Sequence, residues 1–377
     1  MGKKINFGPG PAKLPEKVLE KAQKELLDYD GLGLSVLEMS HRSADFAKII
    51  NDAEALLREL MQIPDNYEVL FMHGGGTGQF AAVPLNLSFL SKNKETPEAD
   101  YLVTGTWSQK AAKEAEKYLK VNKVANLEKY TTAPPTNEWK LSNNAAYLYY
   151  CANETIHGVE IADLSGLPEN VNLIADISSN ILSNLIDISK HIAIVAGTQK
   201  NLGIGGLTLV IIRKDLIGHE QKSTPGILSY ASISSNKSLY NTPCVFAIYI
   251  TKLVLEWIKE EGGVQEMYER SKKKSDLIYN LIDNSNGFYQ SPVTKQHRSR
   301  MNIPFRIKEN AELEAKFLKE ATAKGMISLK GKHNIVLKLT SLRWWHSCFT
   351  VQRREPRRNS KVGRFPRRIP QKQRIMK

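Results

Sequence analysis

The segment His191-Ile-Ala-Ile-Val-Ala-Gly-Thr-Gln-Lys200 decides how this chain is interpreted. It is a short apolar run, typical of a buried strand, that ends in small and polar residues and then in a lysine. A second apolar run, Val171-Asn-Leu-Ile-Ala-Asp176, ends in the same way with an aspartate. Burying an ammonium group costs free energy, so a lysine at the end of a buried strand suggests a chemical role. Taken alone, such a lysine is more often a surface residue, and the rest of the chain must decide.

A lysine and an aspartate in these positions are the protein groups that pyridoxal phosphate chemistry requires. The lysine forms a Schiff base with the cofactor, and the aspartate fixes the pyridinium nitrogen. Gly74-Gly-Gly-Thr-Gly78 follows an apolar strand and opens an apolar helix, so its amides favour a phosphate. Trp107 follows another apolar strand and offers a flat face to a ring. Taken alone, the glycines could simply form a tight turn between strand and helix, and the tryptophan could simply be part of the core.

The composition indicates an ordinary soluble globular protein of two domains. The chain has 377 residues, of which 41% are hydrophobic and 24% charged. No apolar run approaches the roughly 20 residues of a membrane span, and the N-terminus lacks a signal-peptide core. Cys151, Cys244 and Cys348 form neither a disulfide framework nor a metal-ligand spacing. We therefore expect a cytosolic protein without a metal site and without membrane contact.

Strand and helix patterns alternate along the body of the chain. Helical periodicity covers residues 15–28, 44–61, 243–260, 264–284 and 311–324. Apolar runs predict strands at 68–72, 101–103, 146–151, 173–175, 192–195 and 207–212, and two more at 301–307 and 326–329. Because the first six runs are almost continuously apolar, we expect an α/β fold with a mostly parallel sheet covered by helices on both faces. The final strand-helix-strand stretch suggests a smaller domain.

Several long segments of the chain resemble the phosphoserine aminotransferases, class V aminotransferases of the fold-type I pyridoxal phosphate enzymes. The resemblance extends from about residue 5 to residue 331. The segments that carry it are Asn6-Phe-Gly-Pro-Gly-Pro-Ala-Lys-Leu-Pro, Leu37-Glu-Met-Ser-His-Arg-Ser, Cys151-Ala-Asn-Glu-Thr-Ile-His-Gly-Val-Glu, Ala175-Asp-Ile-Ser-Ser-Asn, Gln199-Lys-Asn and Leu239-Tyr-Asn-Thr-Pro. It implies a large cofactor-binding domain at 17–260 and a small α+β domain formed by 1–16 and 261–331.

The resemblance also implies a role for individual residues. Lys200 and Asp176 would be catalytic, the first as Schiff-base and proton-transfer residue and the second as partner of the ring nitrogen. The other cofactor-binding residues would be Gly76, Thr77, Trp107, Thr155, Gln199, Asn241 and Thr242. The last two would reach the cofactor phosphate of a partner subunit, which makes the site that of a homodimer. His41 and Arg42 would bind the substrate's phosphate or the side-chain carboxylate of glutamate, since a planar guanidinium accepts either anion.

The reaction implied is the transamination of 3-phosphohydroxypyruvate by glutamate. It would yield O-phosphoserine and 2-oxoglutarate, a step of serine biosynthesis. Another class V aminotransferase, with a different amino donor or keto acid, is the alternative within the enzymes. The Met-Ser-His-Arg segment that ends at Arg42 argues against that alternative.

After Gly331 the chain departs from the family pattern. The family continues with a glycine-flanked segment whose second arginine binds the substrate α-carboxylate, and a closing helix follows. Here the chain continues Lys332-His-Asn-Ile-Val-Leu-Lys-Leu-Thr-Ser-Leu-Arg343, with no arginine at the matching spacing. Translation in a shifted frame would produce such a change, and alternative splicing or a sequencing error would look the same. We therefore expect impaired activity.

The charge of the chain is concentrated in this C-terminal part. Residues 330–377 contain 15 Lys or Arg and a single acidic residue, Glu355, which accounts for the whole net charge of +14. With Trp344, Trp345 and Phe365 interleaved, 332–377 could bind RNA or an anionic membrane through charge and stacking. The simpler expectation is a disordered, solvated tail, with no nucleic acid as partner.

Overall fold

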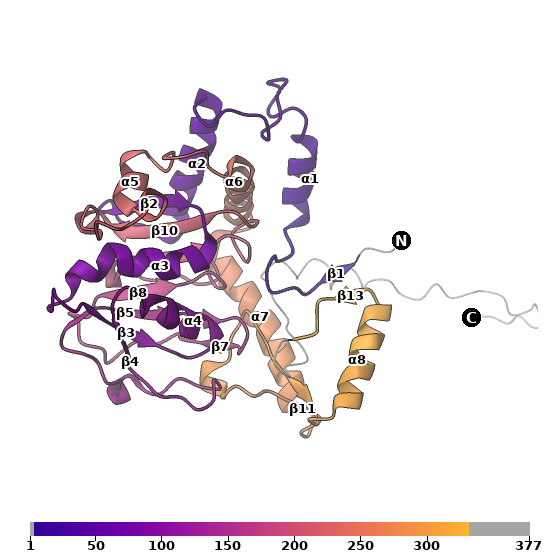
Figure 1. Cartoon of the computed structure of the whole chain (residues 1–377). Coiled ribbons are helices and arrows are strands. Elements are labelled where there is room, and N and C mark those ends of the chain that lie inside the picture. Colours follow the sequence, from indigo (N-terminus) through magenta and orange to yellow (C-terminus); the bar gives the residue numbers. More distant parts are fainter. Residues whose placement is uncertain (1–3, 332–377) are drawn as a thin grey trace, which may run out of the picture.

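The structure, a computed structural model, describes residues 4–331 and is built around one seven-stranded sheet (Figure 1). Across the sheet the strands are β2 (Tyr67–Met72), β10 (Thr208–Arg213), β9 (His191–Gly197), β8 (Leu173–Asp176), β5 (Ala145–Cys151), β3 (Glu98–Leu102) and β4 (Lys120–Lys123). β10 runs antiparallel to both of its neighbours, and the other adjacent pairs are parallel. The predicted α/β class with a mostly parallel sheet is confirmed. The prediction of a disordered basic tail at 332–377 lies outside the described residues.

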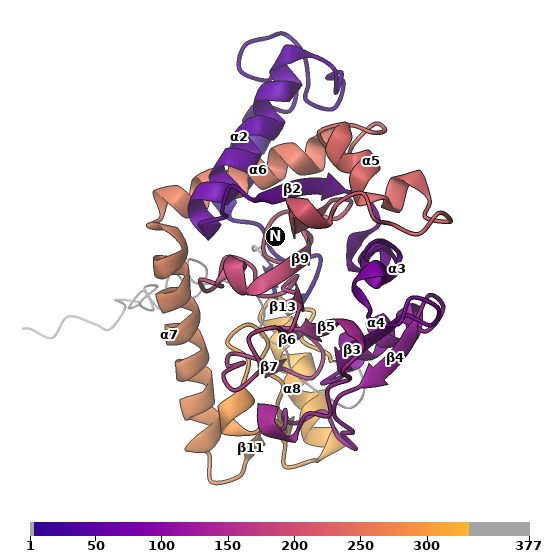
Figure 2. The ribbon, with the colours of Figure 1, turned by 90° about the vertical axis from the view of Figure 1, so that its left-hand side faces the viewer.

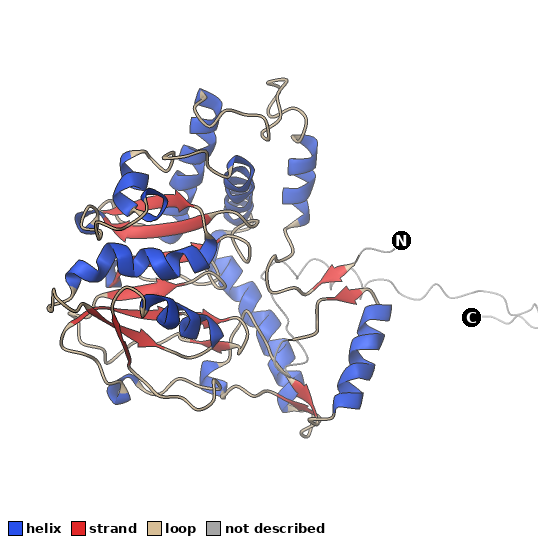
Figure 3. Ribbon diagram, viewed as in Figure 1, coloured by secondary structure: helices blue, strands red, loops and turns tan. Residues whose placement is uncertain are grey.

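Helices cover both faces of the main sheet (Figure 3). The α-helices within residues 4–331 are α1 (Glu16–Lys24), α2 (Ala44–Met61), α3 (Gly75–Leu87), α4 (Thr106–Ala115), α5 (Tyr230–Ser235), α6 (Val245–Glu260), α7 (Gly263–Asp283) and α8 (Ala311–Ala323). Of these, α8 lies outside the two cores of the main sheet. Alternate side chains of each strand enter separate cores: Leu209 and Ile211 pack with α2 and α6, whereas Val210 and Ile212 pack with α3 and α4. None of the helices within residues 4–331 is long and apolar enough to cross a bilayer.

The long amphipathic helices agree closely with their prediction from periodicity. α2 begins at Ala44 because the Ser43 hydroxyl accepts a hydrogen bond from the Phe46 amide, and it ends at Met61 because Gln62 adopts a left-handed conformation. Figure 2 shows α2 beside α6, which buries its apolar stripe. α7 starts at Gly263, after Gly262 with φ of 104°.

Two predictions of elements were incomplete. The predicted strand at 301–307 is reduced to β12 (Arg306–Ile307), because Pro304 has no N–H and Asn302 bonds to the side chain of Asn153. Helix α4 was not predicted, because its buried positions are mostly alanines and give a weak apolar stripe. That omission matters because α4 carries Trp107.

A smaller α+β unit lies beside the main sheet. It contains α8, the pair β1 (Ile5–Asn6) and β13 (Met326–Ile327), and the pair β11 (Tyr289–Gln290) and β12. Its own core joins the N-terminal strand to the end of α7 and to α8, through Phe7, Tyr279 and Ala321. Figure 1 shows α7 running between the two parts. The boundaries at 16/17 and 260/261 stay predictions.

Candidate active site

Lys200 lies in the turn that follows β9, half-buried at the carboxyl edge of the sheet. Its Nζ donates a hydrogen bond to Thr155 Oγ1 at 2.7 Å. The same Nζ lies 5.2 Å from the centroid of the Trp107 ring. Three predicted site residues from separate parts of the chain therefore meet around one amine.

Asp176 ends β8, the strand between β5 and β9, and is 5% exposed. Its Oδ1 accepts hydrogen bonds from the Ser178 amide at 2.9 Å and the Ser178 hydroxyl at 2.6 Å. Its Oδ2 has a longer contact, 3.4 Å, with the Tyr149 hydroxyl. Burial, reinforced by the nearby Asp176 carboxylate, raises the pKa of Tyr149 well above its ordinary value, so this phenol remains a neutral donor. Asp176 is thus a fixed carboxylate with acceptor capacity left on Oδ2.

The glycine run after β2 forms the N-terminal end of α3. Gly74 and Gly75 have φ of 92° and 62°, a backbone region that favours glycine. α3 begins at Gly75 and has neither a side-chain cap nor an acidic residue in its first turn. The first amides of a helix have no intrahelical partner, so those of Gly75, Gly76 and Thr77 are available to an anion.

A cavity of about 490 Å³ joins these elements. Of the predicted site residues, those that line it are Gly76, Thr77, Trp107, Thr155, Asp176, Gln199 and Lys200. The N-terminal segment closes one side, since Pro9 and Gly10 also line the cavity and the Ala12 amide donates to the Gln199 carbonyl. Lys330 and Gly331, the last described residues, border it as well.

Several residues of this cavity were not predicted from the sequence. Ser178 fixes Asp176 and accepts a hydrogen bond from the Gly197 amide at 2.9 Å, which ties β8 to the end of β9. Cys151 also lines the cavity, and burial raises the pKa of its thiol, so the thiol is neutral. Both residues stand in segments that carried the family resemblance, and that was the signal available for them.

Four predicted residues do not line the cavity of their own chain. His41 is half-buried and Arg42 is exposed, in the loop before α2. Asn241 and Thr242 are exposed in the segment before α6. Asn241 Nδ2 lies 3.4 Å from Nε2 of His73, the residue before the glycine run.

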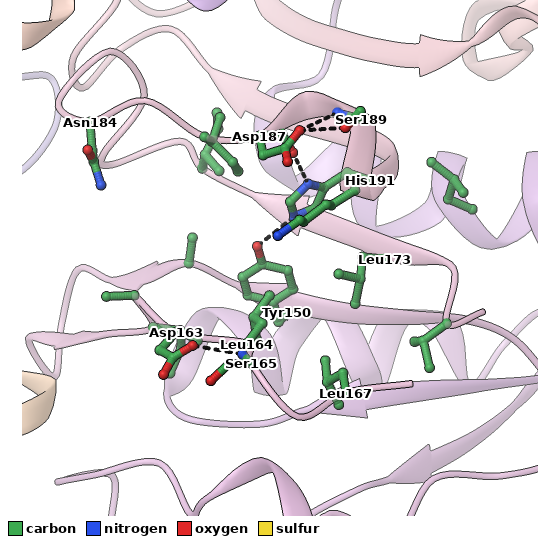
Figure 4. A pocket seen from close by; sticks show the side chains of 18 of the residues that line it. Tyr150, Asp163, Leu164, Ser165, Leu167, Leu173, Asn184, Asp187, Ser189 and His191 are labelled. Carbon is green, nitrogen blue, oxygen red and sulfur yellow. Dashed lines mark hydrogen bonds between the residues drawn. The ribbon is translucent and has the colours of Figure 1, made fainter. Parts of the chain in front are cut away.

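A larger cavity, about 870 Å³, lies elsewhere over the sheet (Figure 4). Its walls include Tyr150 and His191, whose hydroxyl and Nε2 are 2.8 Å apart. His191 Nδ1 lies 2.9 Å from the Asp187 carbonyl oxygen, which can only accept, so Nδ1 carries the proton. Burial lowers the pKa of His191, which keeps the imidazole neutral. None of the predicted site residues lines this cavity, so the candidate site is the smaller one.

Comparison with known proteins agrees with this geometry. The pattern of the family described as aminotransferase class-V matches residues 5–343. The chain belongs to this family. We expected the resemblance to stop at Gly331, and the class-V match ends twelve residues later, at residue 343.

Individual class-V relatives match most of the chain. A probable phosphoserine aminotransferase of Caenorhabditis elegans is 53% identical over 338 residues, 89% of this chain and 90% of that protein. The structure of phosphoserine aminotransferase from Bacillus circulans subsp. alkalophilus superposes with a TM-score of 0.87 at 40% identity, covering 93% of this chain and 96% of that one. The phosphoserine aminotransferase from Trichomonas vaginalis, solved with pyridoxal phosphate bound, gives 0.84 at 35% identity, with coverages of 91% and 96%.

Proposed function

We propose that this chain is a pyridoxal-phosphate-dependent aminotransferase that converts 3-phosphohydroxypyruvate and glutamate to O-phosphoserine and 2-oxoglutarate. The observation that carries the proposal is the convergence of Lys200, Asp176 and Trp107 on one cavity. Over most of its length, the chain shares about half of its residues with phosphoserine aminotransferases. The activity belongs to serine biosynthesis.

The residues of the cavity fit pyridoxal phosphate. Asp176 Oδ2 offers an acceptor to the pyridinium N–H, and the glycines at the start of α3 offer amides to the phosphate. Gly76 lies beside the carboxylate, since a Cβ there would be 3.8 Å from Asp176 Oδ2, an ordinary contact distance. The cavity volume of about 490 Å³ suits a ligand of this size.

Each of these side chains would have a definite task. When bound, the cofactor supplies an electron sink for the bonds at the substrate α-carbon. Asp176 would keep the ring nitrogen protonated, and Trp107 would cover one face of the ring. Lys200 would hold the cofactor covalently and, when free, take the proton from the substrate α-carbon through Nζ. Thr155 orients that Nζ through the 2.7 Å hydrogen bond and would also bond the phenolic oxygen of the ring.

We further propose that two copies of the chain form a homodimer with shared active sites. The segment before His41 exposes large apolar side chains: Leu27 is 84% exposed and Leu37 is 61% exposed. Tyr240, next to Asn241, is 47% exposed. Solvation of this much apolar surface is unfavourable, and a second copy would cover it. His41 and Arg42 would then bind the substrate anion, and Asn241 and Thr242 the cofactor phosphate, each in the partner's site.

Compartment and domain division complete the proposal. Cys151 and Cys244 are both free thiols, which suits the reducing cytosol. The large cofactor-binding domain would comprise 17–260 and the small domain 1–16 with 261–331. The separate core around Phe7, Tyr279 and Ala321 supports this division.

A transamination assay tests the function. With glutamate as donor, purified protein should form O-phosphoserine from 3-phosphohydroxypyruvate, with a higher kcat/KM than for glyoxylate or oxaloacetate. Mass spectrometry of both products would establish the reaction, and Lys200→Ala is the matched control. A higher kcat/KM for one of the other keto acids would assign the chain to another class V aminotransferase.

A further inference from the structure

We propose that Glu154 is a positioning residue that holds Trp107 over the cofactor cavity. The proposal rests on the proposed function, because it takes Trp107 as the residue that covers the cofactor ring. Glu154 lies in the short strand β6 (Asn153–Glu154), which pairs with β7 (Val159–Glu160). It is completely buried, whereas a carboxylate inside a protein normally requires strong partners.

The partners of Glu154 are the first residues of α4. Its Oε2 accepts a hydrogen bond from the Trp107 amide at 3.1 Å. Its Oε1 accepts from the Ser108 amide at 2.8 Å and from the Ser108 hydroxyl at 2.6 Å. The residue before the helix, Gly105, has no side chain that could cap these amides. Glu154, which lies in β6, therefore caps the N-terminus of α4. The partial positive charge at this end of the helix favours an anion.

Gly105 leaves the space that this carboxylate occupies. Its φ of 180° is extended backbone that any residue can adopt, so conformation does not require glycine here. A Cβ on Gly105 would instead lie 2.6 Å from Glu154 Cγ. The glycine and the glutamate are thus sterically matched, and a larger residue at 105 would displace the carboxylate.

The hydrogen-bond pattern favours the ionised form of Glu154. Both carboxylate oxygens accept hydrogen bonds from N–H donors, so a proton on either oxygen would point toward an N–H group and weaken that hydrogen bond. The pKa of Glu154 is nevertheless raised, because the effect of burial exceeds the opposing effects of the hydrogen bonds from Ser108 and Trp107 and of the nearby Lys200 ammonium. Replacement of one oxygen by an NH₂ group would put donor against donor and push the Trp107 backbone away.

Two neighbouring residues therefore position two groups of the site. Thr155 bonds to the Lys200 amine, and Glu154 bonds to the backbone of Trp107, whose ring lines the cavity. The Trp107 indole N–H is buried and has no hydrogen-bond partner within residues 4–331, so no hydrogen bond of the ring itself fixes its position. The position of the ring depends on the backbone that Glu154 holds and on packing.

The test compares Glu154→Gln with Glu160→Gln in the full chain. Glu160 is the matched control, because it is a buried glutamate of the same hairpin but bonds to Arg300 instead of α4. We expect Glu154→Gln to raise the pyridoxal phosphate dissociation constant about tenfold, from the loss of a charged hydrogen bond. The visible circular dichroism of the bound cofactor should also weaken, and Glu160→Gln should change neither. Gly105→Ala should reproduce the effect through the same contact.

A double-mutant cycle shows whether the effect passes through Trp107. In a Trp107→Ala background, Glu154→Gln should alter the cofactor dissociation constant less than about twofold. Equal effects with and without the indole, or equal effects of Glu154→Gln and Glu160→Gln, would overturn the proposal. If Glu154→Gln does not fold, Gly105→Ala and the milder Ser108→Ala take its place in the cycle. If the chain binds the cofactor normally but does not use 3-phosphohydroxypyruvate as a substrate, the proposed function is wrong. The double-mutant cycle still tests the role of Glu154, because it measures only cofactor binding.

Discussion

The amine of Lys200 and the hydroxyl of Thr155, 45 residues apart in the chain, are joined by a hydrogen bond of 2.7 Å. Lys200 follows β9 of the main sheet, and Thr155 follows β6, the short strand just after β5. The parallel register of β5, β8 and β9 brings both residues to the carboxyl edge of the main sheet. Open α/β sheets bind ligands at this edge, because the loops that leave the strands converge there. The bond aims Lys200 Nζ across the cavity, with the Trp107 ring 5.2 Å away.

Lys200→Ala should remove covalent attachment of the cofactor and nearly all transamination. We expect kcat to fall by about 10²- to 10⁴-fold, the usual contribution of a positioned acid–base group. Borohydride reduction followed by peptide mass spectrometry measures attachment directly. A reduced cofactor found on any other lysine would contradict the assignment.

Asp176→Asn should bind the cofactor but transaminate slowly. The amide keeps an oxygen for Ser178, yet its NH₂ group cannot accept the pyridinium proton. Loss of one charged hydrogen bond predicts a decrease in kcat of roughly 10- to 150-fold. Steady-state kinetics at saturating cofactor would measure it, and an unchanged kcat would exclude Asp176 as the ring-nitrogen partner.

The double substitution Asn241→Ala, Thr242→Ala tests the shared site. Both side chains are exposed in one chain, so their removal should leave the cores intact. If they complete the partner's phosphate site, the cofactor dissociation constant should rise roughly tenfold or more, from the loss of hydrogen bonds to a charged group. Asn236→Ala, exposed at the end of α5, is the control. A monomer by analytical ultracentrifugation that binds the cofactor as tightly as a dimer would refute the arrangement.

The sequence predicted those parts of the site that depend on local pattern. Lys200 and Asp176 each end an apolar run, and parallel strands bring such ends together. Glu154 and Ser108 could not be predicted in this way, because they are 46 residues apart and meet only through the pairing of β6 with β7 and the position of α4. α4 itself was missed, since alanines such as Ala111 and Ala112 give too little apolar contrast. Segment 301–307 was predicted as a strand from its apolar residues, and these are buried in the structure. Pro304 and the side-chain bond of Asn302 prevent strand pairing before Arg306.

His191 should make stability depend on pH. Burial lowers its pKa in the folded protein below the ordinary 6.5, whereas the unfolded chain has the ordinary value. As pH falls below about 6.5, the unfolded state therefore binds a proton that the folded state does not, and stability is lost by up to about 1.4 kcal/mol per pH unit. The loss stops once the pH is below the folded-state pKa.

His191→Gln removes this titration, so it provides the comparison. The unfolding temperature of the parent chain should fall relative to that of the variant between pH 7.5 and pH 5.5, as measured by differential scanning fluorimetry. A constant difference across this range would mean that His191 is protonated equally in both states. The neutral tautomer assigned from the contacts with Asp187 and Tyr150 would then be wrong.

The last prediction concerns the segment that follows Gly331. Ser328, Lys330 and Gly331 border the cofactor cavity, so the described structure ends at the edge of the site. The family's arginine for the substrate α-carboxylate is expected there, and this chain has none at the matching spacing. Truncation of a bidentate arginine–carboxylate contact in a desolvated site costs about 2–5 kcal/mol.

Replacement of residues 332–377 by the C-terminal segment of the Caenorhabditis elegans relative should therefore raise kcat/KM for 3-phosphohydroxypyruvate by roughly 30- to several-thousand-fold. Cofactor binding is the internal control, because the residues that line its cavity up to Gly331 are already present, so its dissociation constant should change little. Equal kcat/KM values for the two chains would mean that Lys332, His333 or Arg343 has replaced the missing arginine. If an arginine-to-alanine change within the transplanted segment reverses the gain in kcat/KM, the gain comes from the carboxylate contact and not from a general effect on folding.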